Sequence, residues 1–409
     1  MRTYSLVSPK LWRPFDSWPH RPCIDVLIAS MQEHHYSPKC IYLTVRIAGY
    51  FVEWLGAQQG QAGELDYTAV DRYVAHRAGA GELRNGERKA LKRLRGILLD
   101  AGIIAAPLPS EDPRERLLEQ FRADLQRRGY REKSIASYLW FCRPFLQEVW
   151  DAEVGLTRIT RASVLAYVEH RASDRSTTTA TIMCSRLRIF LRFLHADDHV
   201  DEDLADCIPS ARHVRLAALP SFMSPDQLTC VLAHCSRASV AGRRDYAILL
   251  LLARLGLRAN EVAMLTLDDI DWRSGVLRIE GKGGRKDSMP LPHEVGAAIA
   301  DYIQHGRPAS AARAVFHRVD APCVPFASAT PVILVARRAL KRAGVTGLGR
   351  RHSHIFRHTL ATSMIRSGAS LTEIGEVLRH QEPDTTRIYA KVDVDSLRRL
   401  SLPWPGGAR

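Results

Sequence analysis

The first half of the chain contains an internal repeat, in which similar residues recur 94 positions later. The segment VDRYVAHRA, which begins at Val70, corresponds without a gap to VLAYVEHRA, which begins at Val164. Tyr36 recurs in the same register as Tyr130. Self-similarity at a fixed distance indicates that one supersecondary unit is used more than once. The sequence therefore predicts two copies of a small module, which restricts the first half of the chain to folds that can be built in duplicate.

Both copies show the residue spacing of amphipathic helices. In the second copy, Leu118, Phe121 and Leu125 recur at helical intervals, so they share one face of a helix. The first copy places the apolar residues Leu27 and Met31 at positions that match Phe121 and Leu125. The repeated module is therefore predicted to be helical.

Proline and small residues gather in two segments, 105–110 and 208–221, which have the composition of linkers. They predict domain boundaries near 110 and 215. The three predicted domains are an N-terminal helical module at 1–110, a second helical module at 111–215 and a larger domain at 216–409.

The last domain has a mixed pattern. Helical spacing surrounds two short strand-like runs, 276–280 and 288–291, and the glycine-rich segment 281–284 between them is typical of a hairpin turn. The predicted fold class is therefore mainly α, with an α+β last domain that contains a small antiparallel sheet.

Charge favours a polyanionic partner, because 58 Lys and Arg residues exceed 44 Asp and Glu residues, for a net charge of +14. The longest strongly apolar run, 246–253, is far shorter than the roughly 20 residues that a membrane-spanning helix needs. The N-terminal segment has no apolar core of a signal peptide. The eight cysteines form no C-x-x-C pair and are expected to be reduced thiols. We therefore expect a cytoplasmic protein without membrane contact.

Six positions in the last domain carry side chains suited to phosphate chemistry. Each one alone is typical of a surface charge, a turn residue, a helix cap or a packed ring. Together with His358, which directly follows the second arginine, they give the order R…K…H-x-x-R-H…H…Y, which is rarely met by accident. They are Arg258, Lys282, His354, Arg357, His380 and Tyr389.

With these residues, the chain resembles the tyrosine recombinase, or phage integrase, family. The resemblance rests on the segment 255–262 (LGLRANEV), the block 354–359 (HIFRHT) and the segment 378–380 (LRH) followed by Tyr389. It implies a recombinase catalytic domain at 216–409. It also implies a SAM-like, core-binding helical domain at 111–215, so that the repeat would make 1–110 a further SAM-like DNA-binding module.

The chain departs from the family pattern at two places. Arg379 stands where a glycine is usual before the histidine, and Ile355-Phe356 stand where Asp-Leu is common. Both departures lie beside the candidate catalytic positions and leave those positions filled.

The resemblance implies that the hydroxyl of Tyr389 attacks a DNA phosphodiester and forms a 3′-phosphotyrosyl ester and a free 5′ hydroxyl. Arg258 and Arg357 would hold the non-bridging oxygens, on which charge builds up in the transition state. Because the ester conserves the energy of the broken bond, no cofactor or metal is required.

The remaining roles concern protons and hydrogen bonds. His354 is the candidate base for the tyrosine proton, His380 would add a donor, and Lys282 is the candidate acid for the leaving 5′ oxygen.

The family resemblance also implies partners. The chain would bind double-stranded DNA and work as a homo-tetramer on two DNA sites, with companion recombinases as a further class of partner. The tail 392–409 contains an apolar set suited to docking on a neighbouring subunit or on its own domain. The expected location is a bacterial cytoplasm, in association with the nucleoid. Integration, excision, transposition of a mobile element and dimer resolution are all compatible with the sequence.

Three other functions fit part of the pattern. A zinc enzyme could use His352, His354 and His358, but Ile355 stands where the H-E-x-x-H motif has its glutamate. A catalytically inactive DNA-binding remnant or regulator would keep the fold without cleavage. A type IB topoisomerase would use the same chemistry to relax supercoils, although the duplicated helical modules favour recombination.

Overall fold

The computed structural model describes residues 8–58, 64–106, 112–151, 155–156, 159–209, 221–281, 286–347, 352–380, 383–386 and 388–389. The chain divides into two compact units. One unit comprises 65–68 and 102–215, and the other comprises 1–64, 69–101 and 216–409.

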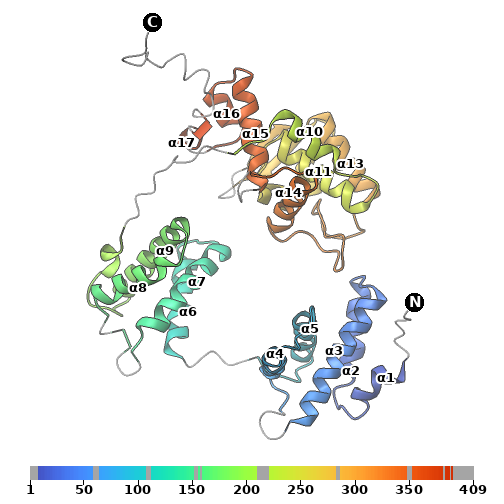
Figure 1. Ribbon diagram of the computed structural model, residues 1–409, viewed down its shortest axis with the longest axis vertical. Helices are drawn as coiled ribbons and strands as arrows, with labels where there is room; N and C mark the ends of the chain where they lie inside the picture. Colours follow the sequence, from blue (N-terminus) through green and yellow to red (C-terminus); the bar gives the residue numbers. More distant parts are fainter. Residues whose placement is uncertain are drawn as a thin grey trace. The chain divides into compact units, whose positions relative to one another are not determined.

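The regular secondary structure of the described residues 8–101 is helical (Figure 1). It contains α1 (Pro9–Trp12), η1 (Arg13–Phe15), α2 (Pro22–Glu33), α3 (Pro38–Ala57), α4 (Ala69–Gly79) and α5 (Glu87–Asp100). The long helix α3 begins where the Ser37 hydroxyl accepts a hydrogen bond from the Cys40 N–H, with Pro38 in the first turn. The apolar face of α3 packs against α2 and α5 and buries Phe51 completely.

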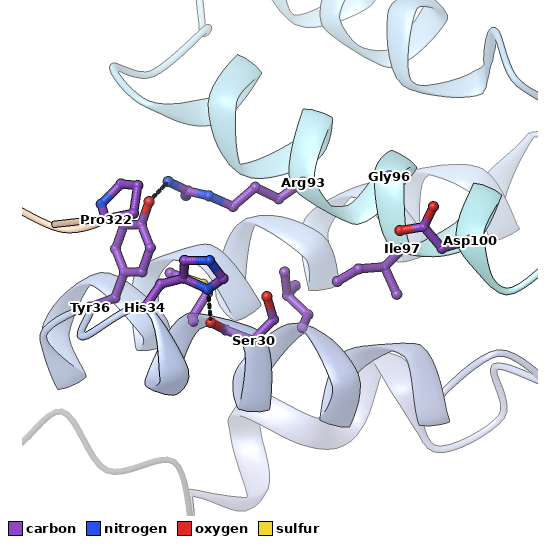
Figure 2. A pocket seen from close by; sticks show the side chains of 10 residues that line it. Ser30, His34, Tyr36, Arg93, Gly96, Ile97, Asp100 and Pro322 are labelled. Carbon is purple, nitrogen blue, oxygen red and sulfur yellow. Dashed lines mark hydrogen bonds between the residues drawn. The ribbon is translucent and has the colours of Figure 1, made fainter. Parts of the chain in front are cut away.

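Tyr36, a repeat-matched residue, has a structural role in this segment. Figure 2 shows it beside a pocket lined by α2 and α5, where an Arg93 Nη donates to its hydroxyl at 2.6 Å. The Arg93 guanidinium also lies 4.5 Å from the centre of the tyrosine ring. These contacts fix the turn between α2 and α3 to α5.

The unit formed by 65–68 and 102–215 is a helical bundle with an aromatic core. It contains α6 (Pro113–Arg127), α7 (Glu132–Val149), α8 (Arg161–Ser173), α9 (Thr177–Ala196) and η3 (Leu204–Cys207). Phe121 of α6 meets Phe190 of α9 at 4.9 Å between ring centres, and Phe145 of α7 packs on Tyr167 of α8 at 5.0 Å. Phe145 also lies 6.3 Å from Phe190 between ring centres, so these aromatic contacts connect all four helices.

The C-terminal segment combines helices with a small sheet. Its helices are α10 (Pro225–Ala233), α11 (Val240–Arg254), α12 (Ala259–Met264), η4 (Leu267–Asp269), α13 (His293–His305), α14 (Thr330–Arg342), α15 (His352–Arg366), α16 (Leu371–Val377) and α17 (Pro383–Thr386). The central helix α11 contacts α13, α14 and α15, and its residues from Ala247 to Ala253 are all buried. This packing explains the longest apolar run of the sequence. No described helix is long and apolar enough to cross a membrane.

The sheet is antiparallel, with the order β1 (Ile270–Asp271), β2 (Val276–Glu280) and β3 (Lys286–Pro290). Leu277 pairs with Met289, and Ile279 pairs with Asp287. The prediction of a mainly helical fold with a small antiparallel sheet is confirmed. The predicted limits of the second strand were wrong, because pairing with β2 begins at Lys286 and ends at Pro290. The two-residue strand β1 was not predicted, since it is too short to show alternation.

Candidate active site

Arg258 is positioned by the turn between α11 and α12. Gly256 ends α11 with φ of +57°, and a β-carbon at this position would lie 2.8 Å from a methyl carbon of Leu378. Arg258 then caps α12. Its backbone N–H and one Nη donate to the two carboxylate oxygens of Glu261 at 2.8 and 2.7 Å. The turn and the carboxylate together fix the guanidinium.

Arg357 lies on α15 and is only 4% exposed. Its Nη1 donates to the Gly256 carbonyl oxygen at 2.6 Å, and its Nη2 donates to the Leu378 carbonyl oxygen. Burial, together with the positive charge of Arg258, lowers the pKa of Arg357 to about 10, so the guanidinium keeps its charge at neutral pH. Arg357 therefore joins the turn that carries Arg258 to the end of α16.

Tyr389 follows α17 and is 1% exposed. Its hydroxyl lies 2.9 Å from Nδ1 of His358, one residue after Arg357 on α15. Burial raises the pKa of Tyr389 to about 12, and Arg357 opposes this effect. The hydroxyl is therefore protonated at neutral pH and needs an acceptor for its proton before it can act as a nucleophile.

His380 lies between α16 and Tyr389. Its ring is parallel to the Tyr389 ring at 6.4 Å between centres, and its Nδ1 lies 2.7 Å from the Thr386 hydroxyl oxygen. Burial and the positive charges of Arg357 and Arg258 lower the pKa of His380 to about 4. The imidazole is therefore neutral at physiological pH and can donate one hydrogen bond while it accepts another.

The fold thus brings four of the six predicted residues into one site: Arg258, Arg357, His380 and Tyr389. His354 is exposed one turn before His358 on α15, and the two ring centres are 6.4 Å apart. Lys282 falls between β2 and β3 in the sequence and lies outside the described residues.

A family model and several known proteins are similar to this chain. The family model "Phage integrase family" matches residues 221–395. The integrase/recombinase y4rA of Sinorhizobium fredii is 38% identical over 371 residues, which cover 89% of this chain and 90% of the relative. Tyrosine recombinase XerD of Xanthomonas axonopodis is 28% identical over 299 residues, which cover 70% of this chain and 94% of the relative.

The chain belongs to the phage integrase family. It is a tyrosine-type site-specific recombinase that acts on DNA.

Solved structures of tyrosine recombinases share its fold. The XerH recombinase in a post-cleavage complex with its difH substrate aligns with a TM-score of 0.54 at 16% identity, covering 82% of this chain and 94% of that one. A lambda integrase dimer bound to a COC′ core site aligns with a TM-score of 0.53 at 18% identity, covering 67% and 94%.

The structure adds three residues to the candidate site that the sequence did not single out as site residues. Glu261 holds Arg258, Arg379 donates to Glu261 at 2.7 Å, and His358 contacts the tyrosine. The spacing of Arg258 and Glu261 matches a capping box and could have identified Glu261. His358 directly follows Arg357 in the motif, but the sequence assigns it no catalytic role, and its contact with a residue 31 positions away depends on tertiary packing.

The structure also explains one departure from the family pattern. Ile355 and Phe356 are 1% and 0% exposed and belong to the main apolar core of the C-terminal segment. They therefore act in packing.

Two of the three histidines in the zinc alternative, His354 and His358, have described side chains. In the described part of the chain, no three His, Cys, Asp or Glu side chains are grouped so that they could hold a metal ion. His358 uses Nδ1 in its hydrogen bond with Tyr389. The side chain of His352 lies outside the described residues.

Proposed function

We propose that this recombinase cleaves and rejoins DNA through a 3′-phosphotyrosine intermediate, with Tyr389 as its nucleophile. The observation that carries the proposal is the convergence on Tyr389 of a charged arginine, Arg357, and two imidazoles, His358 and His380. A buried tyrosine used only for packing needs one hydrogen-bond partner for its hydroxyl, and the arginine and the second imidazole go beyond that need.

The proposed reaction is a transesterification. The Tyr389 oxygen forms a bond to phosphorus, the bond from phosphorus to the 5′ oxygen breaks, and the 5′ oxygen receives a proton. A 5′ hydroxyl from a partner duplex later attacks the ester and releases the tyrosine. The number of phosphoester bonds is unchanged in each step.

The two arginines would stabilise the charge that develops on the phosphate. A guanidinium has five N–H donors. Arg357 donates one N–H from each of its two Nη groups to a backbone carbonyl, so further N–H groups remain for phosphate oxygens. Arg258 faces the same region, because its second Nη lies 3.5 Å from the carbonyl oxygen of Arg379, next to His380.

The histidines would manage the tyrosine proton. His358 holds the hydroxyl at 2.9 Å and joins His354 as a candidate acceptor, while neutral His380 can donate to a phosphate oxygen. Because Tyr389 is 1% exposed, its hydroxyl must become accessible when DNA binds. Lys282, which follows β2 in the sequence, is the proposed acid for the 5′ oxygen.

Cofactor independence tests this chemistry directly. A nicked suicide duplex, from which a short 5′-hydroxyl fragment diffuses away after cleavage, should trap a covalent protein–DNA complex in EDTA and without nucleotide. The complex is measured on a denaturing gel. Cleavage that stops in EDTA and resumes with a divalent ion, or products without attached protein, would contradict the mechanism.

We further propose three domains with boundaries near 110 and 215, the first two being copies of one SAM-like DNA-binding module. Support comes from the helix content, because each segment contains four successive helices, α2–α5 in the first and α6–α9 in the second. Tyr73 and its repeat partner Tyr167 are both buried. His35 and its partner Gly129 both have positive φ, 58° and 75°, in the turns that precede Tyr36 and Tyr130.

The N-terminal module would bind DNA outside the site held by the second module. Helix α5 exposes three basic residues, Arg88, Lys89 and Lys92. Their simultaneous replacement by glutamate should weaken DNA binding and shorten the protected footprint. If all three contact phosphates, the slope of log affinity against log salt concentration should fall by about 3.

The matched control replaces the exposed Lys10 of α1 by glutamate. An unchanged footprint and salt dependence in the α5 triple variant, measured by nuclease protection and mobility shift, would show that this module does not bind DNA through α5.

The proposed assembly is a homo-tetramer on two double-stranded DNA sites, in the cytoplasm of a bacterium. The structure of a lambda integrase tetramer bound to a Holliday junction aligns with a TM-score of 0.53 at 18% identity and supports this assembly by similarity of fold. The tail 392–409, predicted to dock, lies outside the described residues. Mobile-element integration, excision or transposition is the proposed role.

A further inference from the structure

Arg379 has a backbone conformation that favours glycine. Its φ is +52°, one of three positive φ values among the described non-glycine residues. Glycine adopts this left-handed conformation at little steric cost, whereas a residue with a β-carbon is strained. An arginine at this position therefore needs a side-chain contact that offsets the strain.

The Arg379 side chain makes such a contact inside the site. It is 8% exposed, and its Nη2 donates to a Glu261 carboxylate oxygen at 2.7 Å. Its Nη1 lies 3.2 Å from the sulfur of Met289 on β3. Glu261 is itself 3% exposed, so the ion pair is buried and weakly screened by solvent.

Glu261 is shared between two arginines. One carboxylate oxygen accepts from a guanidinium Nη of Arg258 at 2.7 Å. The other accepts from the Arg258 backbone N–H at 2.8 Å and from Arg379. The second Nη of Arg258 points back to the Arg379 carbonyl oxygen at 3.5 Å. Arg258, Glu261 and Arg379 therefore form a closed ring of polar contacts.

The charges in this ring do not cancel. Burial alone would raise the pKa of Glu261, but the N–H of Arg258 and the charges of Arg379 and Arg258 outweigh burial and lower it. The carboxylate is therefore ionised, and two guanidinium groups share one negative charge. The ring keeps a net positive charge beside His380, and Glu261 does not neutralise Arg258 alone.

We propose that Arg379 is a positioning residue that fixes Glu261, and through it the guanidinium of Arg258, in the direction required by the DNA phosphate. This inference rests on the role of Arg258 proposed above. The inference also explains why an arginine stands at position 379 in place of the usual glycine. A glycine would relieve the backbone strain, but Glu261 would then pair with Arg258 only.

Three substitutions at Arg379 test the inference. Arg379→Met keeps an unbranched apolar stem and removes the charge, Arg379→Lys keeps the charge without the planar fork, and Arg379→Gly relieves the backbone strain. Single-turnover cleavage of the nicked duplex is measured over a range of DNA concentrations, together with the melting temperature of each full-length variant.

We expect Arg379→Met and Arg379→Gly to lower the saturating cleavage rate roughly 10- to 100-fold, the size of effect that misplacement of a reacting group produces. The DNA concentration at half-saturation should change little, and Arg379→Lys should recover part of the rate. The melting temperature of Arg379→Gly should stay close to that of the wild type, because relief of the strained φ offsets the lost ion pair. In an Arg258→Ala background, Arg379→Met should slow cleavage little further, because both changes act through one group.

Wild-type cleavage by Arg379→Met, or equal slowing in the presence and absence of the Arg258 side chain, would overturn the inference. The cleavage rates of Arg258→Ala and Arg379→Met distinguish failure of this inference from failure of the proposed function. If Arg258→Ala itself cleaves at the wild-type rate, the role of Arg258 is wrong. If Arg258→Ala is slow and Arg379→Met is fast, only the role of Arg379 is wrong.

Discussion

Replacing Tyr389 by phenylalanine is expected to abolish the covalent protein–DNA complex and strand exchange and to leave DNA binding nearly unchanged. Phenylalanine fills the same buried space, since the ring is 1% exposed, and it loses only the oxygen and its hydrogen bond to His358. No other atom of that side chain can attack phosphorus. The suicide duplex on a denaturing gel measures cleavage, and mobility shift measures binding.

The matched control is Tyr302→Phe on α13. Tyr302 is completely buried, and its hydroxyl accepts a hydrogen bond from the His317 N–H at 3.3 Å, away from the proposed nucleophile. This variant should still form the covalent complex. Loss of the complex in both variants would indicate that removal of any buried hydroxyl disturbs the fold, and its persistence in Tyr389→Phe would exclude Tyr389 as the nucleophile.

Replacing Arg357 by alanine should slow cleavage by roughly 10²-fold or more, the usual effect of removing one donor to a developing negative charge. The change should also lower stability, because the carbonyls of Gly256 and Leu378 lose their buried donors. Each buried group left without a partner costs about 1–3 kcal/mol. Arg357→Lys should keep the charge and still cleave slowly, because an ammonium group cannot reproduce the planar fork.

Arg254 supplies the control for this series. It lies at the end of α11, is partly exposed and pairs with Glu294 of α13 at 2.9 Å. Arg254→Ala should alter stability by about 0–1 kcal/mol, as expected for a surface ion pair, and should cleave normally. Single-turnover rates and melting temperatures are measured for all three variants. Cleavage by Arg357→Ala at the wild-type rate would remove Arg357 from the mechanism.

The sequence predicted the elements whose pattern is local. Helical spacing around the two strand-like runs predicted a mainly helical last domain, and the glycine-rich segment 281–284 predicted the pairing of β2 with β3. The order of the basic residues and Tyr389 matches a family pattern, and four of its six residues lie together in the structure: Arg258, Arg357, His380 and Tyr389.

Contacts between distant segments could not be predicted in the same way. Nothing in the local sequence around His358 shows that its ring faces Tyr389, since that contact depends on how α15 packs against the segment after α17. Glu261 and Arg379 are separated by 118 positions in the sequence, and only the folded structure shows that they form a buried ion pair. Arg379 appeared in the sequence as a departure from glycine, and its contact with Glu261 became visible only in the structure.

The most direct test of the account identifies the atoms that join protein to DNA. The trapped complex is digested with nuclease and protease, and the peptide that carries a nucleotide is sequenced by mass spectrometry. The account predicts a single adduct on Tyr389, linked to the 3′ phosphate of the cleaved strand, with a free 5′ hydroxyl on the released fragment. An adduct on another residue, or a link to a 5′ phosphate, would contradict it.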